Sequence, residues 1–152
     1  MKSPLGYFNI DIDKFLREYC PSYIGIYAPD TLPKLQKKKI GCLITNLSNS
    51  KTIGTHYVSI IITKNDVIYI DPFGMNAEDE RIRNFLQSFD KPVSFNCEQI
   101  QSFTSNECGL YAAVMCIYYD KVIIRKVKKY FTLYFTKNLE KNDVLIAKYM
   151  DM

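Results

Sequence analysis

The run Cys108–Tyr119 limits the folds open to this chain more than any other feature of its sequence. Every residue in it is apolar, aromatic or glycine, and the run is too long for one β-strand. It contains Ala112, Ala113 and Met115, which are good helix formers. A helix that is apolar on every side lies inside a protein. We therefore predict a buried helix over residues 108–119 that begins at Cys108.

Two runs of β-forming residues indicate a hairpin in the middle of the chain. Residues 56–63 and 67–71 are rich in Ile, Val and Tyr, and a Lys-Asn-Asp turn at 64–66 separates them. The second run stops at Asp71-Pro-Phe-Gly74, because proline cannot donate to a strand ladder and glycine lets the backbone turn. An antiparallel pair centred on this turn would bring Asp71 near His56.

Shorter patterns supply the other elements of the fold. Apolar side chains at helical spacing predict two amphipathic helices, and short β-branched runs predict two more strands. The predicted elements are helices at 11–19 and 76–89, strands at 40–46 and 92–97, a loop at 21–35, and one or two helices within 121–150. This order indicates a single α+β domain over residues 1–152.

The composition is that of a folded intracellular protein. Apolar residues make up 47% of the 152 residues and charged residues 24%, which suits one soluble domain. The start of the chain does not read as a signal sequence, and no window approaches the roughly 20 apolar residues of a membrane span. Five cysteines without a CxxC pair indicate reduced thiols and no zinc site.

Basic residues gather in two short segments, although the net charge of the chain is only +4. One segment holds Lys34 and residues 37–39, and the other spans residues 125–129. Such a charge run is most often a solvated surface. It would also allow weak, salt-dependent contact with a polyanion such as DNA.

One of the five cysteines has the position of a nucleophile. A thiol reacts as its thiolate, and the first turn of a helix lowers the pKa of a thiol because unpaired N–H groups carry partial positive charge there. Cys108 is predicted to have that place. Cys116 would lie in the middle of the same helix among apolar side chains, and Cys42 and Cys97 fall in predicted strands.

The other groups that a cysteine peptidase needs are also present. His56 is the only histidine and would serve as the base, and Asp71 would orient its imidazole. A side-chain amide upstream of the cysteine, from Gln99 or Gln101, would join the Cys108 N–H in an oxyanion hole. Taken alone, each of these residues has an ordinary structural explanation.

The order His, acid, Gln, Cys resembles that of the adenovirus-type maturation proteases, the adenains, which are related to the Ulp1-type SUMO peptidases. Gly54-Thr55-His56-Tyr57, Asp71-Pro-Phe-Gly74 and the segment Gln101–Leu110 are similar to the motifs of that family. The spacing from glutamine to cysteine matches the adenain form and selects Gln101 over Gln99. Tyr57 stands where the family usually has Trp, and Asp71 stands where adenains tend to have Glu.

The resemblance implies a papain-like cysteine peptidase fold of the adenain/Ulp1 type, with a central mixed sheet and the catalytic cysteine at the start of a buried helix. His56, Asp71, Gln101 and Cys108 would be catalytic. A further set of residues would bind substrate: Gly54, Thr55, Tyr57 and Glu107. No cofactor would be required and no metal is expected. DNA or an activating peptide stays open as an activator, although the sequence itself indicates neither.

The function implied is a virus- or transposon-encoded endopeptidase that cleaves capsid or virion precursors. It would act as a monomer in the host cytoplasm or nucleus and in the virion, with polypeptide substrates and no membrane. One alternative is a peptidase that removes SUMO or ubiquitin-like proteins. An alternative from another class is an inactive binding module with a protease fold.

Overall fold

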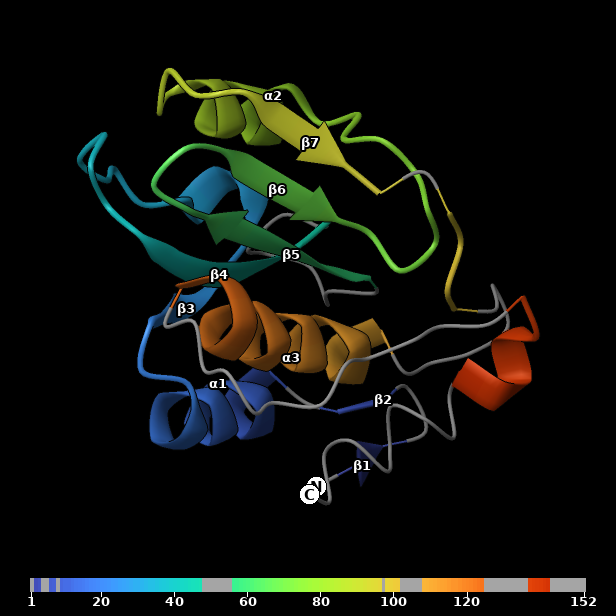
Figure 1. The fold of residues 1–152 in the computed structure, drawn as a ribbon. Helices are drawn as coiled ribbons and strands as arrows, with labels where there is room; N and C mark the ends of the chain where they lie inside the picture. Colours follow the sequence, from blue (N-terminus) through green and yellow to red (C-terminus); the bar gives the residue numbers. More distant parts are fainter. Residues whose placement is uncertain are drawn as a thin grey trace.

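A five-stranded mixed sheet forms the centre of the protein (Figure 1). The computed structural model describes residues 2–3, 6–7, 9–47, 56–96, 98–101, 108–124 and 137–142. In order across the sheet the strands are β3 (Tyr23–Tyr27), β4 (Gly41–Asn46), β5 (Tyr57–Ile62), β6 (Val67–Ile70) and β7 (Val93–Phe95). The middle strands are antiparallel, whereas β3 and β7 run parallel to their neighbours. The predicted α+β class and mixed sheet are confirmed.

Helices cover both faces of this sheet. α1 (Asn9–Tyr19) and α3 (Cys108–Tyr119) lie on one face, and α2 (Glu80–Gln87) lies on the other (Figure 1). A short 3-10 helix, η1 (Pro29–Thr31), lies beside α2, and a π-helical turn, η2 (Asp120–Ile124), follows α3. β1 (Lys2–Ser3) and β2 (Gly6–Tyr7) form a separate antiparallel pair.

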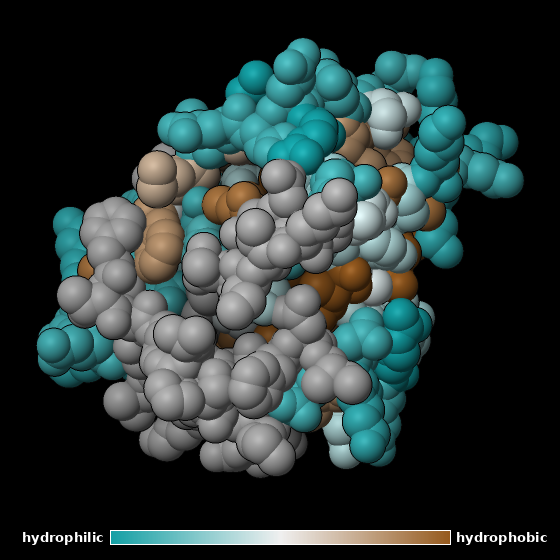
Figure 2. Space-filling model, turned by 180° about the vertical axis from the view of Figure 1, so that it is seen from behind, coloured by the Kyte–Doolittle hydropathy of each residue, from teal (hydrophilic) through white to brown (hydrophobic). Residues whose placement is uncertain are grey.

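The central strands are buried on both sides, which explains their uninterrupted apolar sequences. In β5, Ile61 packs in the cluster with α1 and α3, whereas Val58 and Ile60 pack in the cluster with α2. Side chains alternate between the faces of a strand, so both faces need apolar residues here. The surface around α2, at the top of the molecule, is mainly hydrophilic (Figure 2). The three layers are thus helix, sheet and helix.

The loop predicted at residues 21–35 is wrong in part, because Tyr23–Tyr27 forms the edge strand β3. Prolines at 21, 29 and 33 and a glycine at 25 mask the β-forming residues between them. The strand pairs on one side alone, with β4, and its register shifts between Tyr23 and Gly25. Long-range pairing with β4 therefore decides the structure against the local signal.

Other predicted boundaries move by a few residues. α2 begins at Glu80 and not at 76, because the Asp79 carboxylate accepts a hydrogen bond from the Arg81 N–H at 2.8 Å and caps the helix there. Of the region 121–150, the described residues contain η2 and one helical turn at 139–142. In the described ranges no helix is both long and apolar enough to cross a bilayer.

α3 runs along β5 in the same direction, which decides where the two elements begin. The Ser59 hydroxyl donates to the Ala112 carbonyl at 3.1 Å. One turn earlier, a methyl group placed on Gly109 would lie 3.6 Å from the Tyr57 ring and 2.5 Å from Ile12 Cδ1. The first turn of α3 therefore lies beside the first residue of β5 and packs against α1.

Ile44→Ala should reduce the free energy of unfolding by about 2–5 kcal/mol, because it leaves a cavity between the sheet and α3. The Ile44 side chain is fully buried in the cluster that contains α3. Urea denaturation followed by circular dichroism measures the change. Ile40→Ala is the matched control, because Ile40 is 41% exposed, and it should change the free energy by less than about 0.5 kcal/mol. Equal losses in the two variants would contradict this packing.

Candidate active site

The site forms at the end of the sheet where β5 begins and β6 ends. His56 directly precedes β5, and Asp71 directly follows β6. His56 Nε2 lies 2.6 Å from Asp71 Oδ1, and both side chains are buried. Ser59 pairs with Ile70, so continuing the ladder would place Phe73 opposite His56 and Asp71 on the diagonal. The register of the hairpin thus brings the imidazole and the carboxylate together.

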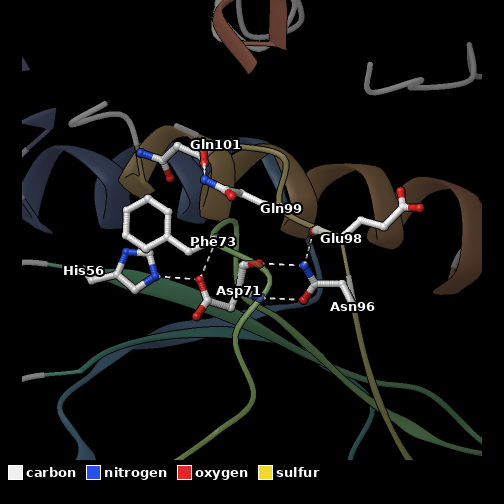
Figure 3. Close-up of polar contacts among 7 residues, drawn as sticks. All are labelled: His56, Asp71, Phe73, Asn96, Glu98, Gln99 and Gln101. Carbon is white, nitrogen blue, oxygen red and sulfur yellow. Dashed lines mark hydrogen bonds and ion pairs between the residues drawn. The ribbon is translucent and has the colours of Figure 1, made fainter. Parts of the chain in front are cut away.

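The Asp71 carboxylate is held by the turn that follows it. Oδ1, the oxygen that contacts His56, also accepts the Phe73 backbone N–H at 2.8 Å. The Gly74 N–H donates to the Asp71 carbonyl at 2.8 Å, which closes the turn. The Asn96 side chain binds the backbone of Asp71 from the other side (Figure 3). The carboxylate therefore meets the imidazole in a fixed position.

Phe73 fixes the plane of the imidazole. Its ring stacks on the His56 ring with centroids 4.1 Å apart and an interplanar angle of 4° (Figure 3). The Phe73 ring covers one face of the imidazole, so the hydrogen bond between His56 Nε2 and Asp71 Oδ1 is shielded from water on that side. In the sequence, Phe73 stands out only as part of the motif Asp71–Gly74. Its position opposite His56 follows from the hairpin register, which is the signal that could have revealed it.

The contact with Asp71 also decides which ring nitrogen can act as a base. An ionised carboxylate only accepts hydrogen bonds, so Nε2 carries the proton of the neutral imidazole. Nδ1 then holds the lone pair. A base built in this way takes a proton through Nδ1 and shares the resulting positive charge with Asp71 through Nε2.

Gln101 is buried over the turn at Asp71–Gly74. Its backbone N–H and that of Ile100 both donate to the Pro72 carbonyl, at 2.9 and 2.8 Å. Its own carbonyl accepts the side-chain amide of Gln99 at 2.8 Å. Gln101 lies on the same side of the turn as Phe73 (Figure 3). Of the two glutamines considered from the sequence, Gln99 has its amide engaged in supporting Gln101.

Cys108 is the first residue of α3, as predicted. Its neighbour Gly109 lies beside Tyr57, the residue after His56. The packing of α3 on β5 therefore brings the start of the helix to the same end of the sheet as His56. The structure describes the backbone of Cys108 and not its side chain.

The residues predicted to bind substrate are mostly outside the described part of the chain. Gly54, Thr55 and Glu107 belong to that group. Tyr57 is described, and its buried ring packs in the cluster with α1 and α3. Its ring therefore has a packing role, and a contact with substrate remains a prediction.

Three other cysteines lie in the core between the sheet and the helices α1 and α3. Cys20, Cys42 and Cys116 are buried free thiols. The Cys20 and Cys42 sulfurs are 3.5 Å apart. Hydrogen bonding to Cys42 and burial raise the pKa of Cys20, and hydrogen bonding to Cys116 and burial raise the pKa of Cys42. Both thiols thus stay protonated and unreactive at neutral pH.

The basic segment before β4 is on the surface. Lys34 and residues 37–39 are exposed, and Lys37 forms an ion pair with Asp90. Residues 125–129 lie outside the described ranges. Over the described chain, no three His, Cys, Asp or Glu side chains are grouped as metal ligands would be.

No protein-family model and no curated protein matches this sequence. The structure itself is an α+β fold in which a helix that begins with cysteine starts at the end of the sheet that carries a buried His–Asp pair.

Solved structures with the same fold were found. The crystal structure of the ASFV pS273R protease superposes with a TM-score of 0.56 at 12% identity, covering 97% of this chain and 68% of the other. The selenomethionine form of the same protease gives a TM-score of 0.54 at 12% identity, covering 97% and 69%. At this level of identity the likeness concerns the fold. The chain therefore has a protease-like fold of the pS273R type.

Cys20 and Cys42 should resist alkylation by iodoacetamide at pH 8.5 in the folded protein. An ordinary exposed thiol is about half ionised at that pH, whereas the raised pKa of these two thiols leaves no thiolate to react. Mass spectrometry of tryptic peptides would show them unmodified until guanidinium unfolds the chain. Modification of either thiol in the folded protein, at the rate of a free cysteine, would contradict the described core.

Proposed function

We propose that this protein is a cysteine peptidase in which Cys108 is the nucleophile and His56 is its base. The observation that carries the proposal is the buried contact of His56 Nε2 with Asp71 Oδ1 at 2.6 Å, which leaves Nδ1 to take the thiol proton. A buried carboxylate needs hydrogen-bond partners, and Asp71 Oδ1 has two, the His56 imidazole and the Phe73 N–H. The protease-like fold and the position of Cys108 at a helix start support the same reading.

In the first half of the reaction, the Cys108 thiol passes its proton to His56 Nδ1. The sulfur attacks the carbonyl carbon of the scissile peptide bond and forms a tetrahedral intermediate. The first turn of α3 favours the thiolate, because its unpaired N–H groups present partial positive charge. The intermediate collapses to a thioester as Nδ1 returns the proton to the leaving amine.

The oxyanion of this intermediate would accept two hydrogen bonds. One comes from the Cys108 backbone N–H and one from the side-chain amide of Gln101. In the second half, His56 takes a proton from water, the hydroxide attacks the thioester, and the Cys108 thiol is released. Asp71 stabilises the imidazolium in both halves.

The proposed substrates are polypeptides, and among them the precursors of virus particles. The order of the motifs resembles that of maturation proteases, and the fold is that of the ASFV pS273R protease. On this proposal the protein acts in the host cytoplasm or nucleus and in the virion. A specificity for glycine near the scissile bond follows from the resemblance, because a narrow cleft excludes side chains.

A vinyl-sulfone activity probe should label Cys108 alone, and the labelling should disappear in Cys108→Ala and in His56→Ala. The reason is that the probe needs an activated thiolate, which His56 supplies. Intact-mass spectrometry and peptide mapping read the site. Cys97→Ser is the matched control and should label like the wild type. Labelling of the His56→Ala variant at the wild-type rate would contradict the assignment of His56 as the base.

Gln101→Ala should lower kcat by roughly 10- to 1,000-fold and leave KM nearly unchanged, which corresponds to one lost oxyanion donor at about 2–4 kcal/mol. The amide would bond the oxyanion more strongly than the substrate carbonyl, so its loss acts on the transition state. Steady-state kinetics on a peptide substrate measure both constants.

The control for this variant is Gln87→Ala, since Gln87 is exposed at the end of α2. Gln99→Ala is less suitable, because its amide supports the Gln101 carbonyl. Gln101→Glu keeps the shape of the side chain and removes the donor, so it should lose at least as much as Gln101→Ala. Full activity in Gln101→Glu would exclude the amide as an oxyanion donor.

A further inference from the structure

Asn96 and residues 98–101 lie directly over the turn at Asp71–Gly74. Pro72 contributes one carbonyl that accepts two backbone N–H groups of the segment, from Ile100 and Gln101. The turn and the segment approach so closely that a Cβ on Gly74 would lie 2.8 Å from both the Gln99 nitrogen and the Glu98 carbonyl carbon. Gly74 also has φ of +74°, which other residues rarely adopt. Asp71 and Gln101 therefore lie on two segments of the chain that are in direct contact.

Asn96 joins these two pieces through its side chain. Its Oδ1 accepts the Asp71 backbone N–H at 2.8 Å, and its Nδ2 donates to the Asp71 carbonyl at 2.6 Å (Figure 3). The same Nδ2 reaches the Glu98 carbonyl at 3.2 Å. An amide offers one acceptor and one donor side by side, which matches the two backbone groups of a single residue.

The position of Asn96 in the ladder explains why a side chain is used. β7 runs parallel to β6, and the Asn96 N–H still donates to the Tyr69 carbonyl at 3.3 Å. The next bond of a parallel ladder would run from the Asp71 N–H to the Asn96 backbone carbonyl. Asn96 Oδ1 accepts that N–H instead. The backbone after Asn96 can therefore turn toward Gln101, while the Asp71 N–H at the end of β6 still has a hydrogen-bond acceptor.

A second amide supports the far end of the segment. Asn142, which is fully buried, donates from Nδ2 to the Ile100 carbonyl at 2.9 Å. The backbone next to Gln101 is thus held by Pro72 on one side and by Asn142 on the other. Of the two asparagines, Asn96 is the one whose side chain contacts Asp71.

We propose that Asn96 is a positioning residue that couples the place of the Asp71 carboxylate to the place of Gln101. The inference rests on the proposed peptidase function for its kinetic consequence, and on the described hydrogen bonds alone for its structural one. Asn96 acts through Asp71 and the segment to Gln101, and it has no contact with the reacting atoms. Without it, the carboxylate would lose its alignment with His56 Nε2.

Nuclear magnetic resonance tests the structural part without any need for activity. His56 is the only histidine of the chain, so one imidazole gives all the signals. A ring N–H held by a buried carboxylate exchanges slowly with water and resonates far downfield. We expect this Nε2–H signal in a Cys108→Ala background and its loss when Asp71→Asn, Asn96→Ala or the isosteric Asn96→Asp is added. Asn96→Asp keeps the acceptor for the Asp71 N–H and loses the donor to its carbonyl.

Asn65→Ala is the matched control, because Asn65 is exposed in the turn between β5 and β6, at the opposite end of the sheet. It should keep the signal. Persistence of the signal in both Asn96 variants would overturn the proposal, and so would its absence from the parent protein. Melting temperatures show whether each variant is folded, which separates a local loss from unfolding.

Kinetics test the coupling to catalysis. Asn96→Ala should lower kcat about 10- to 100-fold, the scale of a misplaced catalytic group, with KM within about twofold. A change in KM with kcat unchanged would refute a positioning role. So would a loss of kcat that is fully accounted for by the fraction of unfolded protein. If the parent protein cleaves no peptide but the Nε2–H signal responds to Asn96 as expected, the peptidase proposal fails and the positioning of Asp71 stands.

Discussion

The packing of α3 along β5 is the interaction on which the rest of this structure depends. It buries an apolar helix against a strand that is itself buried along its whole length, and it brings the first residues of both to one end of the sheet. His56 and Cys108 lie at those two starts. A helix of opposite direction could bury the same area but would leave the cysteine at the far end of the sheet. Direction, and not area alone, therefore creates the site.

Much of the fold could be predicted because its signals are local. The hairpin of β5 and β6 follows from two β-forming runs and a polar turn, and α3 follows from an apolar run with helix formers. β3 could not be predicted in this way, because its prolines and glycine favour a loop and its partner β4 is distant in the sequence. The parallel pairing of β7 with β6 has no local signal either, since α2 lies between them in the chain.

The residues of the candidate site likewise divide into those that the sequence predicts and those that it does not. His56 and Asp71 could be paired from the sequence, because the symmetry of a hairpin relates their positions. The spacing to cysteine predicts Gln101, and the structure places Gln101 over the turn that carries Asp71. No sequence pattern marks Asn96 or Asn142, because their side chains bind backbone groups. A bond from a side chain to the backbone depends on the path of the folded chain. Any residue type can supply the backbone partner, so the sequence shows no pattern.

The Asn142 contact has a consequence for the time at which the site forms. The groups brought together here come from residues 56, 71, 96, 101, 108 and 142, so their assembly closes long loops and belongs to the slower class of folding reactions. A ribosome must have released residue 142 before the Gln101 segment gains its last support. On the proposed function, the active site is therefore complete only after this whole region has been synthesised, because the Gln101 segment gains its contact with Asn142 only then.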